Sequence, residues 1–324
     1  MKKFLIIQTA FLGDVVLATA LVEKLRKCYP EAQIDFLLRK GNEGLLEGHP
    51  HLRSVLIFNK KEKYRSLRRL IRRIRAKRYD VVINAHRFFT SGLLAVASGA
   101  REVAGFDKNP LSFAFSRRLP HRIGEGDPPP HEVERNLSLI EHLTGEGFEK
   151  PRLYPPKEAY TKVPKDTNYI CIAPTSVWFT KQWPAERWIE LIGKLPVGHT
   201  VYLLGGTADR EACEEIRRAV RHPQVINRAG ELSLLESAAL MQHARMNYAN
   251  DSAPIHLASA VDAPVTAVFC STIPAFGFGP LSTESRVVET HHKLACRPCG
   301  LHGYRACPEG HFLCADIEVE RVRG

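Results

Sequence analysis

The sequence lacks any stretch of about 20 residues free of charge and strong polarity, so none of its helices is expected to cross a bilayer. It also lacks a convincing secretory signal. Residues 1–20 imitate one, with two early lysines, an apolar centre and small residues at its end, but Gln8 and Asp14 interrupt the apolar centre. The helical pattern also continues past the apparent cleavage point. We therefore expect a soluble protein in the reducing cytoplasm, where its 8 cysteines stay free or hold metal.

Acidic residues are scarce in the first half of the chain. Residues 1–162 carry 30 Lys and Arg against 18 Asp and Glu, whereas the remainder carries 16 against 17. The densest basic part is 60–78, where Leu67, Leu70 and Ile74 lie on an apolar stripe of a predicted helix. This helix is either an ordinary solvated face or a surface that attracts a membrane, an acidic glycolipid or nucleic acid. Nucleic acid is disfavoured, because no reading motif or aromatic platform accompanies the charge.

A length of 324 residues suits two domains, and the first half has an alternating pattern of strands and helices. Such alternation predicts a parallel sheet with helices on both faces. The predicted strands are 4–7, 34–38, 54–58, 80–84 and 101–106, and the predicted helices are 15–25, 60–78 and 91–97. A further helix is predicted over 132–143.

Clustered prolines at 151–164 mark a linker, because prolines stiffen a connection without joining a sheet. The alternation then restarts, with strands at 169–173, 200–206, 246–250 and 263–269 and helices at 184–195, 209–220, 232–244 and 253–260. We divide the chain into domains 1–160 and 161–324. The sequence predicts an α/β fold of two Rossmann-like domains that face each other across a cleft, which is the default binding site.

The first candidate site lies where the strand at 4–7 passes into the first helix. Gly13 ahead of a helix allows close approach of the backbone to a ligand, and the N–H groups of the first turn favour negative charge. Asp14 lies in this turn. It either complements the helix dipole, as many such acids do, or performs chemistry. The loop 84–90 follows a neighbouring strand and is expected at the same edge of the sheet.

The second candidate site is the segment NDSAPIHLASA, residues 250–260, which ends a strand and opens a helix. Asp251 or Ser252 can cap this helix, and His256 falls in its second turn; ordinary capping would explain both. Other strand ends of this half supply hydroxyl groups, a lysine and glycines. These residues are Thr175, Ser176, Lys181, Gly205 and Gly206. Together they predict an anion pocket.

The order of several short motifs resembles glycosyltransferase family 9, the ADP-heptose:lipopolysaccharide heptosyltransferases, nearest the heptosyltransferase II type. The motifs are GDVVLAT at 13–19, YP at 29–30, HP at 49–50, TKQWP at 180–184, LLGG at 203–206, NDSAPIHLA at 250–258 and a cysteine-rich tail. The resemblance implies a GT-B fold, an ADP-sugar in the C-terminal domain and inverting transfer. It further implies a lipid A core acceptor at the N-terminal domain. This acceptor is an acidic glycolipid, so we expect peripheral contact with the inner membrane. We expect no nucleic-acid partner and no cofactor for catalysis.

Matched to the family motifs, Asp14 corresponds to the proposed general base and Lys181 to the lysine on the donor phosphates. Asp251, Ser252 and His256 correspond to the D-S-x-x-x-H donor motif, with Thr175 and Ser176 in the phosphate-binding loop. Candidate acceptor contacts are Gly13, His86, Arg87, Arg117 and Arg118. The chain departs from the family at Gln8, usually Arg, at Ala253, usually Gly, and at 269–274, where the usual F-G-x-T-x-P reads FCSTIP.

The tail contains Cys296, Cys299, Cys307 and Cys314, with His311 nearby. These residue types and their compact spacing suit a structural zinc site, while free thiols and disulfides are the alternatives. A zinc ion here would serve folding rather than catalysis. The other cysteines lie in predicted helices and strands and are expected in the core.

Two other functions fit the same fold. Phosphate loops do not read the base, so the donor could be a UDP- or GDP-sugar. The chain could instead be a non-catalytic module that binds a nucleotide or an acidic lipid. Asp14 discriminates a glycosyltransferase from a binding module, because a binding module does not need a general base.

Overall fold

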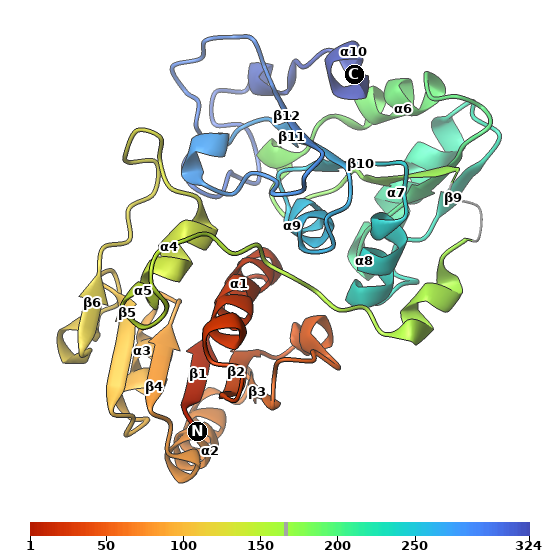
Figure 1. Ribbon diagram of the computed structural model, residues 1–324. Helices are drawn as coiled ribbons and strands as arrows, with labels where there is room; N and C mark the ends of the chain where they lie inside the picture. The colour runs from red at the N-terminus through yellow and green to blue at the C-terminus, as the bar shows by residue number, and fades with distance from the viewer. Residues whose placement is uncertain (165–167) are drawn as a thin grey trace. The chain divides into compact units, whose positions relative to one another are not determined.

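A computed structural model describes residues 1–164 and 168–324. The chain forms two compact units, Met1–Tyr154 and Pro155–Gly324 (Figure 1). The boundary lies inside the proline-rich run that the sequence marks as a linker. None of the helices in the described ranges combines the length and the apolarity that crossing a bilayer requires.

The first unit is built on a six-stranded sheet in which all neighbouring strands are parallel. The strands are β1 (Lys3–Ile7), β2 (Gln33–Arg39), β3 (Ser54–Phe58), β4 (Val81–Asn84), β5 (Glu102–Phe106) and β6 (Arg117–Leu119). The helices are α1 (Leu12–Cys28), α2 (Lys63–Lys77), α3 (Phe89–Val96), α4 (Glu132–Ser138) and α5 (Glu141–Thr144). The strand order is β3-β2-β1-β4-β5-β6, so the order reverses between β1 and β4.

The apolar runs predicted as strands form the core of this unit. Leu5 and Ile7 of β1 pack with the apolar stripe of α2, where Leu67, Leu70 and Ile74 are buried. The arginines of α2 remain exposed on the other side of the helix. The predicted basic amphipathic helix is therefore confirmed, and its polar face is available at the surface of the unit.

The second unit repeats the architecture with a second six-stranded parallel sheet. The strands are β7 (Tyr169–Ala173), β8 (Thr200–Leu203), β9 (Val225–Asn227), β10 (Met246–Asn250), β11 (Val265–Phe269) and β12 (Ser285–Glu289). The helices are α6 (Ala185–Gly193), α7 (Arg210–Ala219), α8 (Leu234–Gln242), α9 (Ala253–Ala260) and α10 (Val319–Arg323). The strand order is β12-β11-β10-β7-β8-β9, and it reverses between β7 and β10.

The end of the chain belongs to the core of the second unit. Trp183 and Trp188 meet at nearly right angles, with ring centroids 4.9 Å apart. Their cluster includes Ile317, Val319 and Val322, all almost fully buried. Cys314 belongs to the same cluster, and Leu294 and Phe312 pack against it, so the tail is connected to the core of the unit.

The predicted α/β fold of two Rossmann-like units is confirmed, with differences at the edges of the sheets. Strands β6, β9 and β12 were not predicted from the sequence. Each is an edge strand with exposed residues and therefore lacks a continuous apolar run. The helix predicted over 132–143 is broken into α4 and α5. At the end of α4, Ser138 Oγ donates a hydrogen bond of 2.7 Å to the carbonyl oxygen of Arg135, an arrangement that tends to bend helices.

Candidate active site

Asp14 lies in the first turn of α1, beyond the carboxyl end of β1. The helix begins at Leu12, so Gly13 is inside the first turn rather than ahead of the helix as expected. The backbone N–H of Phe11 donates to Asp14 Oδ2 at 3.1 Å. This bond is one half of a capping box, so the carboxylate does stabilise the helix terminus.

The environment of Asp14 favours its protonated form more than water would. Burial raises the pKa of Asp14 to about 6, and the negative charge of Glu132 adds to this effect. The backbone hydrogen bonds and the charge of Arg87 oppose the shift. A carboxyl group with a pKa near 6 is mostly ionised at pH 7 and accepts a proton more readily than an exposed one.

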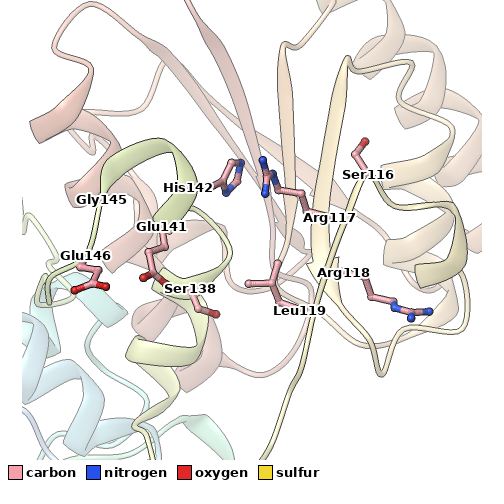
Figure 2. Close-up of a pocket in the computed structure, with 9 residues that line it drawn as sticks. All are labelled: Ser116, Arg117, Arg118, Leu119, Ser138, Glu141, His142, Gly145 and Glu146. Atoms are coloured by element: carbon pink, nitrogen blue, oxygen red, sulfur yellow. The ribbon is translucent and has the colours of Figure 1, made fainter.

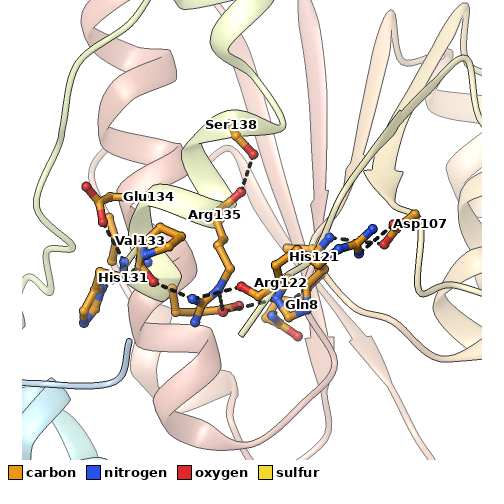
Figure 3. A network of polar contacts seen from close by, with 12 residues as sticks. Gln8, Asp107, His121, Arg122, His131, Val133, Glu134, Arg135 and Ser138 are labelled. Carbon is orange, nitrogen blue, oxygen red and sulfur yellow. Dashed lines mark hydrogen bonds and ion pairs between the residues drawn. The ribbon is translucent and has the colours of Figure 1, made fainter. Parts of the chain in front are cut away.

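Glu132, which raises the pKa of Asp14, contacts His121 and Arg135, and both of these residues are labelled in the polar network of Figure 3. Its Oε2 accepts from Arg135 Nε at 2.8 Å and lies 3.2 Å from His121 Nε2. Although burial raises it, the bonds from His121 and Arg135 hold the pKa of Glu132 below its usual value. Glu132 therefore stays charged. Sequence reasoning missed it, because in the sequence it is only one acid at the start of a predicted helix.

Three cations from three strand ends lie along the same edge of the first sheet. Arg39 ends β2, Lys60 follows β3 and Arg87 follows β4, and these strands lie on both sides of β1. Burial lowers the pKa of His86 to about 4, and the charges of Lys60, Arg87 and Arg39 lower it further. The three cations therefore lie within electrostatic range of His86. Arg39 and Lys60 were not predicted, since neither belongs to a recognisable motif.

The same histidine is a positioning group rather than a free ligand. His86 is buried, and its Nδ1 lies 2.8 Å from Thr9 Oγ1, which follows β1. This bond joins β1 and β4 at the point where the strand order reverses. A neutral His86 adds no positive charge to the edge at pH 7.

Exposed aromatic rings accompany these cations. Phe11, Phe88 and Phe89 are each more than half exposed. The guanidinium of Arg39 lies 5.0 Å from the ring centroid of Phe11, and that of Arg87 lies 5.6 Å from the ring of Phe88. Such pairs are cation–π contacts. The edge around Asp14 therefore offers both positive charge and apolar surface.

The structure places Arg117 and Arg118 elsewhere, in a pocket of about 590 Å³ between β6 and α5 (Figure 2). In this pocket Arg117 Nε and His142 Nε2 both pair with Glu102, at 3.0 and 2.5 Å. The lining residues are Ser116, Arg117, Arg118, Leu119, Ser138, Glu141, His142, Gly145 and Glu146. Asp14 is not among these lining residues, and β4 and β5 separate the strand of the two arginines, β6, from β1.

In the second unit, the loop after β7 is fixed by one buried amide. Asn250 Nδ2 donates to the Pro174 carbonyl at 2.8 Å, and its Oδ1 accepts from the Trp183 backbone N–H at 2.9 Å. Asn250 thus holds both ends of the loop that carries Thr175, Ser176 and Lys181. Sequence analysis read this asparagine only as the end of a strand.

Lys181 and Asp251 form an ion pair at the edge of the second sheet. Lys181 Nζ lies 2.6 Å from Asp251 Oδ2, and Thr272 Oγ1 donates to the same oxygen at 2.5 Å. Asp251 therefore engages the lysine instead of capping α9. Thr272 belongs to the segment that departs from the family pattern, yet it keeps a defined polar contact.

The remaining predicted donor residues lie at the ends of adjacent strands. Ser252 is the N-cap of α9 without a side-chain cap bond, and His256 is buried in the second turn. The N–H of Gly206 donates to Asp209 Oδ2 at 2.7 Å, and a Cβ on Gly205 would lie only 2.7 Å from Asp209 Cβ. Because β10, β7 and β8 are neighbours, these groups share one edge with Thr175 and Ser176. That edge can hold an anion.

None of the four tail cysteines forms a disulfide with another cysteine of the described residues. Cys296 Sγ lies 3.8 Å from His311 Nε2. Across residues 1–164 and 168–324, no three His, Cys, Asp or Glu side chains gather in an arrangement that would hold a metal ion. The structural zinc site at these cysteines stays a prediction.

The sequence matches known proteins over most of its length. The model of glycosyltransferase family 9 (heptosyltransferase) matches residues 67–302. The lipopolysaccharide heptosyltransferase 3 of Escherichia coli is 31% identical over 81% of this chain and 82% of its own. The lipopolysaccharide heptosyltransferase 2 of Escherichia coli K12 is 26% identical over 99% of this chain and 96% of its own.

The fold is also that of a solved relative. The structure of the Escherichia coli ADP-heptose lipopolysaccharide heptosyltransferase II superposes with a TM-score of 0.81 and 23% identity. The match covers 100% of this chain and 96% of that one. This likeness identifies the fold as GT-B.

We expect the Asp14 carboxyl to titrate at a pH of about 6 in carbon-detected NMR of the folded protein. Glu132→Gln removes a negative charge that raises this pKa, so the titration should move to lower pH. Glu134→Gln on the same helix is the control, since it should leave the titration in place. An Asp14 that titrates near the ordinary value of about 3.9 would contradict this account.

Proposed function

Because the chain belongs to glycosyltransferase family 9, the heptosyltransferases, we propose that it moves a heptose from ADP-heptose to the lipid A core of lipopolysaccharide. The observation that carries the proposal is the placement of Asp14, a carboxylate with a raised pKa at an edge lined by cations. The donor is inferred from the solved relative, which is named for ADP-heptose.

The second unit is proposed to hold the donor diphosphate. Lys181 pairs with Asp251 just ahead of α9, and the N–H groups of a first helical turn favour phosphate oxygens. As the bond from the anomeric carbon to the phosphate oxygen breaks, negative charge grows on ADP. Lys181 and the helix terminus stabilise that charge.

Asp14 is proposed to act as the general base. Its carboxylate accepts the proton of an acceptor hydroxyl while that oxygen bonds to the anomeric carbon from the face opposite to ADP. The configuration is therefore inverted. A positioned base of this kind contributes about 10²- to 10⁴-fold in rate. A pKa of about 6 keeps the base ionised at pH 7 and predicts that activity falls below that value.

The edge around Asp14 is proposed as the acceptor site. Arg39, Lys60 and Arg87 supply positive charge for acidic sugars or phosphates, and Phe11 and Phe88 supply exposed apolar surface. An acceptor that is anionic and amphipathic matches both features. Gly13 lies in the same turn as Asp14, and His86 fixes the loop that carries Arg87.

Helix α2 is proposed to rest on an anionic membrane surface. It contains no acidic residue, and none of its six arginines has an ion pair within the described part of the chain. These arginines are Arg65, Arg68, Arg69, Arg72, Arg73 and Arg75. Each basic residue near an anionic leaflet contributes roughly 1 kcal/mol to binding. Since the acceptor is a lipid, such contact keeps the enzyme beside its substrate.

The donor assignment is tested by thermal shift with ADP, UDP and GDP. ADP at 100 times its dissociation constant should stabilise the protein by about 2.7 kcal/mol, and the other two nucleotides by less. Lys181→Ala should weaken ADP binding about 30-fold, since a bond to a charged group contributes roughly 2 kcal/mol. Lys194→Ala, in an exposed ion-pair network of the same unit, is the control. Equal stabilisation by UDP or GDP would contradict the ADP donor.

The membrane contact is tested by flotation with vesicles of phosphatidylglycerol and phosphatidylethanolamine. Replacing Arg68, Arg69, Arg72 and Arg73 by Gln should release the protein, and raised salt should do the same because the attraction is screened. Arg217→Gln with Arg218→Gln is the matched control, since both arginines pair with Glu214. If the α2 variant floats like the wild type, α2 is only a solvated face.

The zinc prediction is tested by elemental analysis of protein purified without added metal. One zinc per chain, lost on replacing Cys296 and Cys299 by Ser, would support a structural site. A metal-free protein with reactive thiols at Cys296, Cys299, Cys307 and Cys314 would contradict it. In neither case is activity the readout.

A further inference from the structure

We propose that the tail segment, residues 294–314, is part of the donor site and positions Lys181 through the side chain of Thr180. This inference rests on the proposed role of Lys181 as the lysine that binds the donor diphosphate. The tail segment is far from the loop 174–183 in sequence, but the two are joined by hydrogen bonds and ring contacts. It carries no residue of the donor motifs.

The hydroxyl of Thr180 is fully used by the tail segment and by the end of β11. Thr180 Oγ1 accepts from the Tyr304 backbone N–H at 2.8 Å and from Ser271 Oγ at 3.0 Å. It donates to the Tyr304 carbonyl oxygen at 3.3 Å, and the Thr180 backbone N–H donates to that oxygen at 3.1 Å. A hydroxyl has one donor and two acceptor positions, so Thr180 has none left for a ligand. Its side chain is completely buried.

Close packing reinforces these hydrogen bonds. Gly303 is buried at a φ of +76°, and a Cβ there would lie 2.9 Å from Thr180 Oγ1 and 3.2 Å from Lys181 Cγ. Only glycine adopts this backbone conformation and allows this approach without strain. On the other side of the loop, the rings of Phe179 and Phe312 lie 5.0 Å apart. The short helix Phe179–Lys181 is therefore contacted by the tail segment at more than one point.

Arg297 ties the same tail segment to the end of β11. Its Nε donates to the Cys270 carbonyl at 2.6 Å, and its Nη2 donates to the Thr272 carbonyl at 2.7 Å. Glu289 balances its charge at 2.6 Å. The backbone carbonyl of Thr272 is thus fixed by Arg297, while the Thr272 side chain holds Asp251.

Both partners of the Lys181–Asp251 pair are therefore supported by the tail segment. Thr180 directly precedes Lys181, and Thr272 contacts Asp251. If these supports loosen, Lys181 samples more positions and binds diphosphate less tightly, because ordering it then costs conformational entropy. Thr180, Gly303 and Arg297 are positioning residues in this account, since none of them is assigned a contact with the substrate.

The test compares Thr180→Val, which removes the hydroxyl at nearly constant volume, with Thr180→Ser, which keeps it. Thr180→Val should weaken ADP binding at least tenfold in calorimetry, and Thr180→Ser should restore the wild-type affinity. Hydrogen exchange at the amides of residues 180 and 304 should be faster in Thr180→Val than in the wild type, and unchanged in Thr180→Ser. Gly303→Ala should behave like Thr180→Val.

Thr266→Val is the matched control, because Thr266 is a buried threonine of β11 whose hydroxyl donates to the Met246 sulfur at 3.8 Å. It should lower the melting temperature without changing ADP affinity. Wild-type ADP affinity in Thr180→Val, or an equal loss of affinity in Thr266→Val, would overturn the proposal. If the wild-type protein binds no ADP, the proposed donor is wrong. Unchanged hydrogen exchange at residues 180 and 304 in Thr180→Val would separately contradict the proposal that the tail segment positions Lys181 through Thr180.

Discussion

In both units the chemistry depends on one constraint of parallel sheets. Where the strand order reverses, the loops after the two central strands lead to opposite sides, and the carboxyl ends of the strands are left open to a ligand. In the first unit this point lies between β1 and β4, where Thr9 and His86 are hydrogen-bonded. In the second unit it lies between β7 and β10, where Asn250 holds the loop of Lys181.

The two edges differ in how their charged groups are arranged, and the proposed roles of the two edges rest on this difference. In the first unit, burial and Glu132 raise the pKa of Asp14, while nearby cations keep the edge attractive to anions. The proposed general base and the proposed surface for an acidic acceptor therefore lie at the same edge. In the second unit, a buried acid and a lysine are paired, and hydroxyl and amide groups fix their positions. That arrangement suits the binding of a diphosphate rather than proton transfer.

The sequence predicted the parts of this structure that follow from periodicity and from motifs. The buried strands, the basic helix α2 and the placement of Asp14, Lys181 and Asp251 at strand ends all follow from local patterns. The partners that tune these groups did not, because Glu132, Asn250, Thr272 and Arg297 act through contacts between distant segments. For Arg117 and Arg118 the sequence predicted a contact with the acceptor, but in the structure this basic pair lies on the edge strand β6 and lines a pocket beside α5. Single cations such as Arg39 and Lys60 can be placed at the edge of Asp14 only when the order of the strands is known.

The most direct test of the account is the rate of heptose transfer by Asp14→Asn, measured together with its affinity for ADP. The account predicts that transfer falls by about 10²- to 10⁴-fold while ADP binds as in the wild type, because Asp14 takes a proton and does not hold the donor. Transfer at the wild-type rate, or loss of ADP binding, would contradict the assignment of Asp14 as the general base.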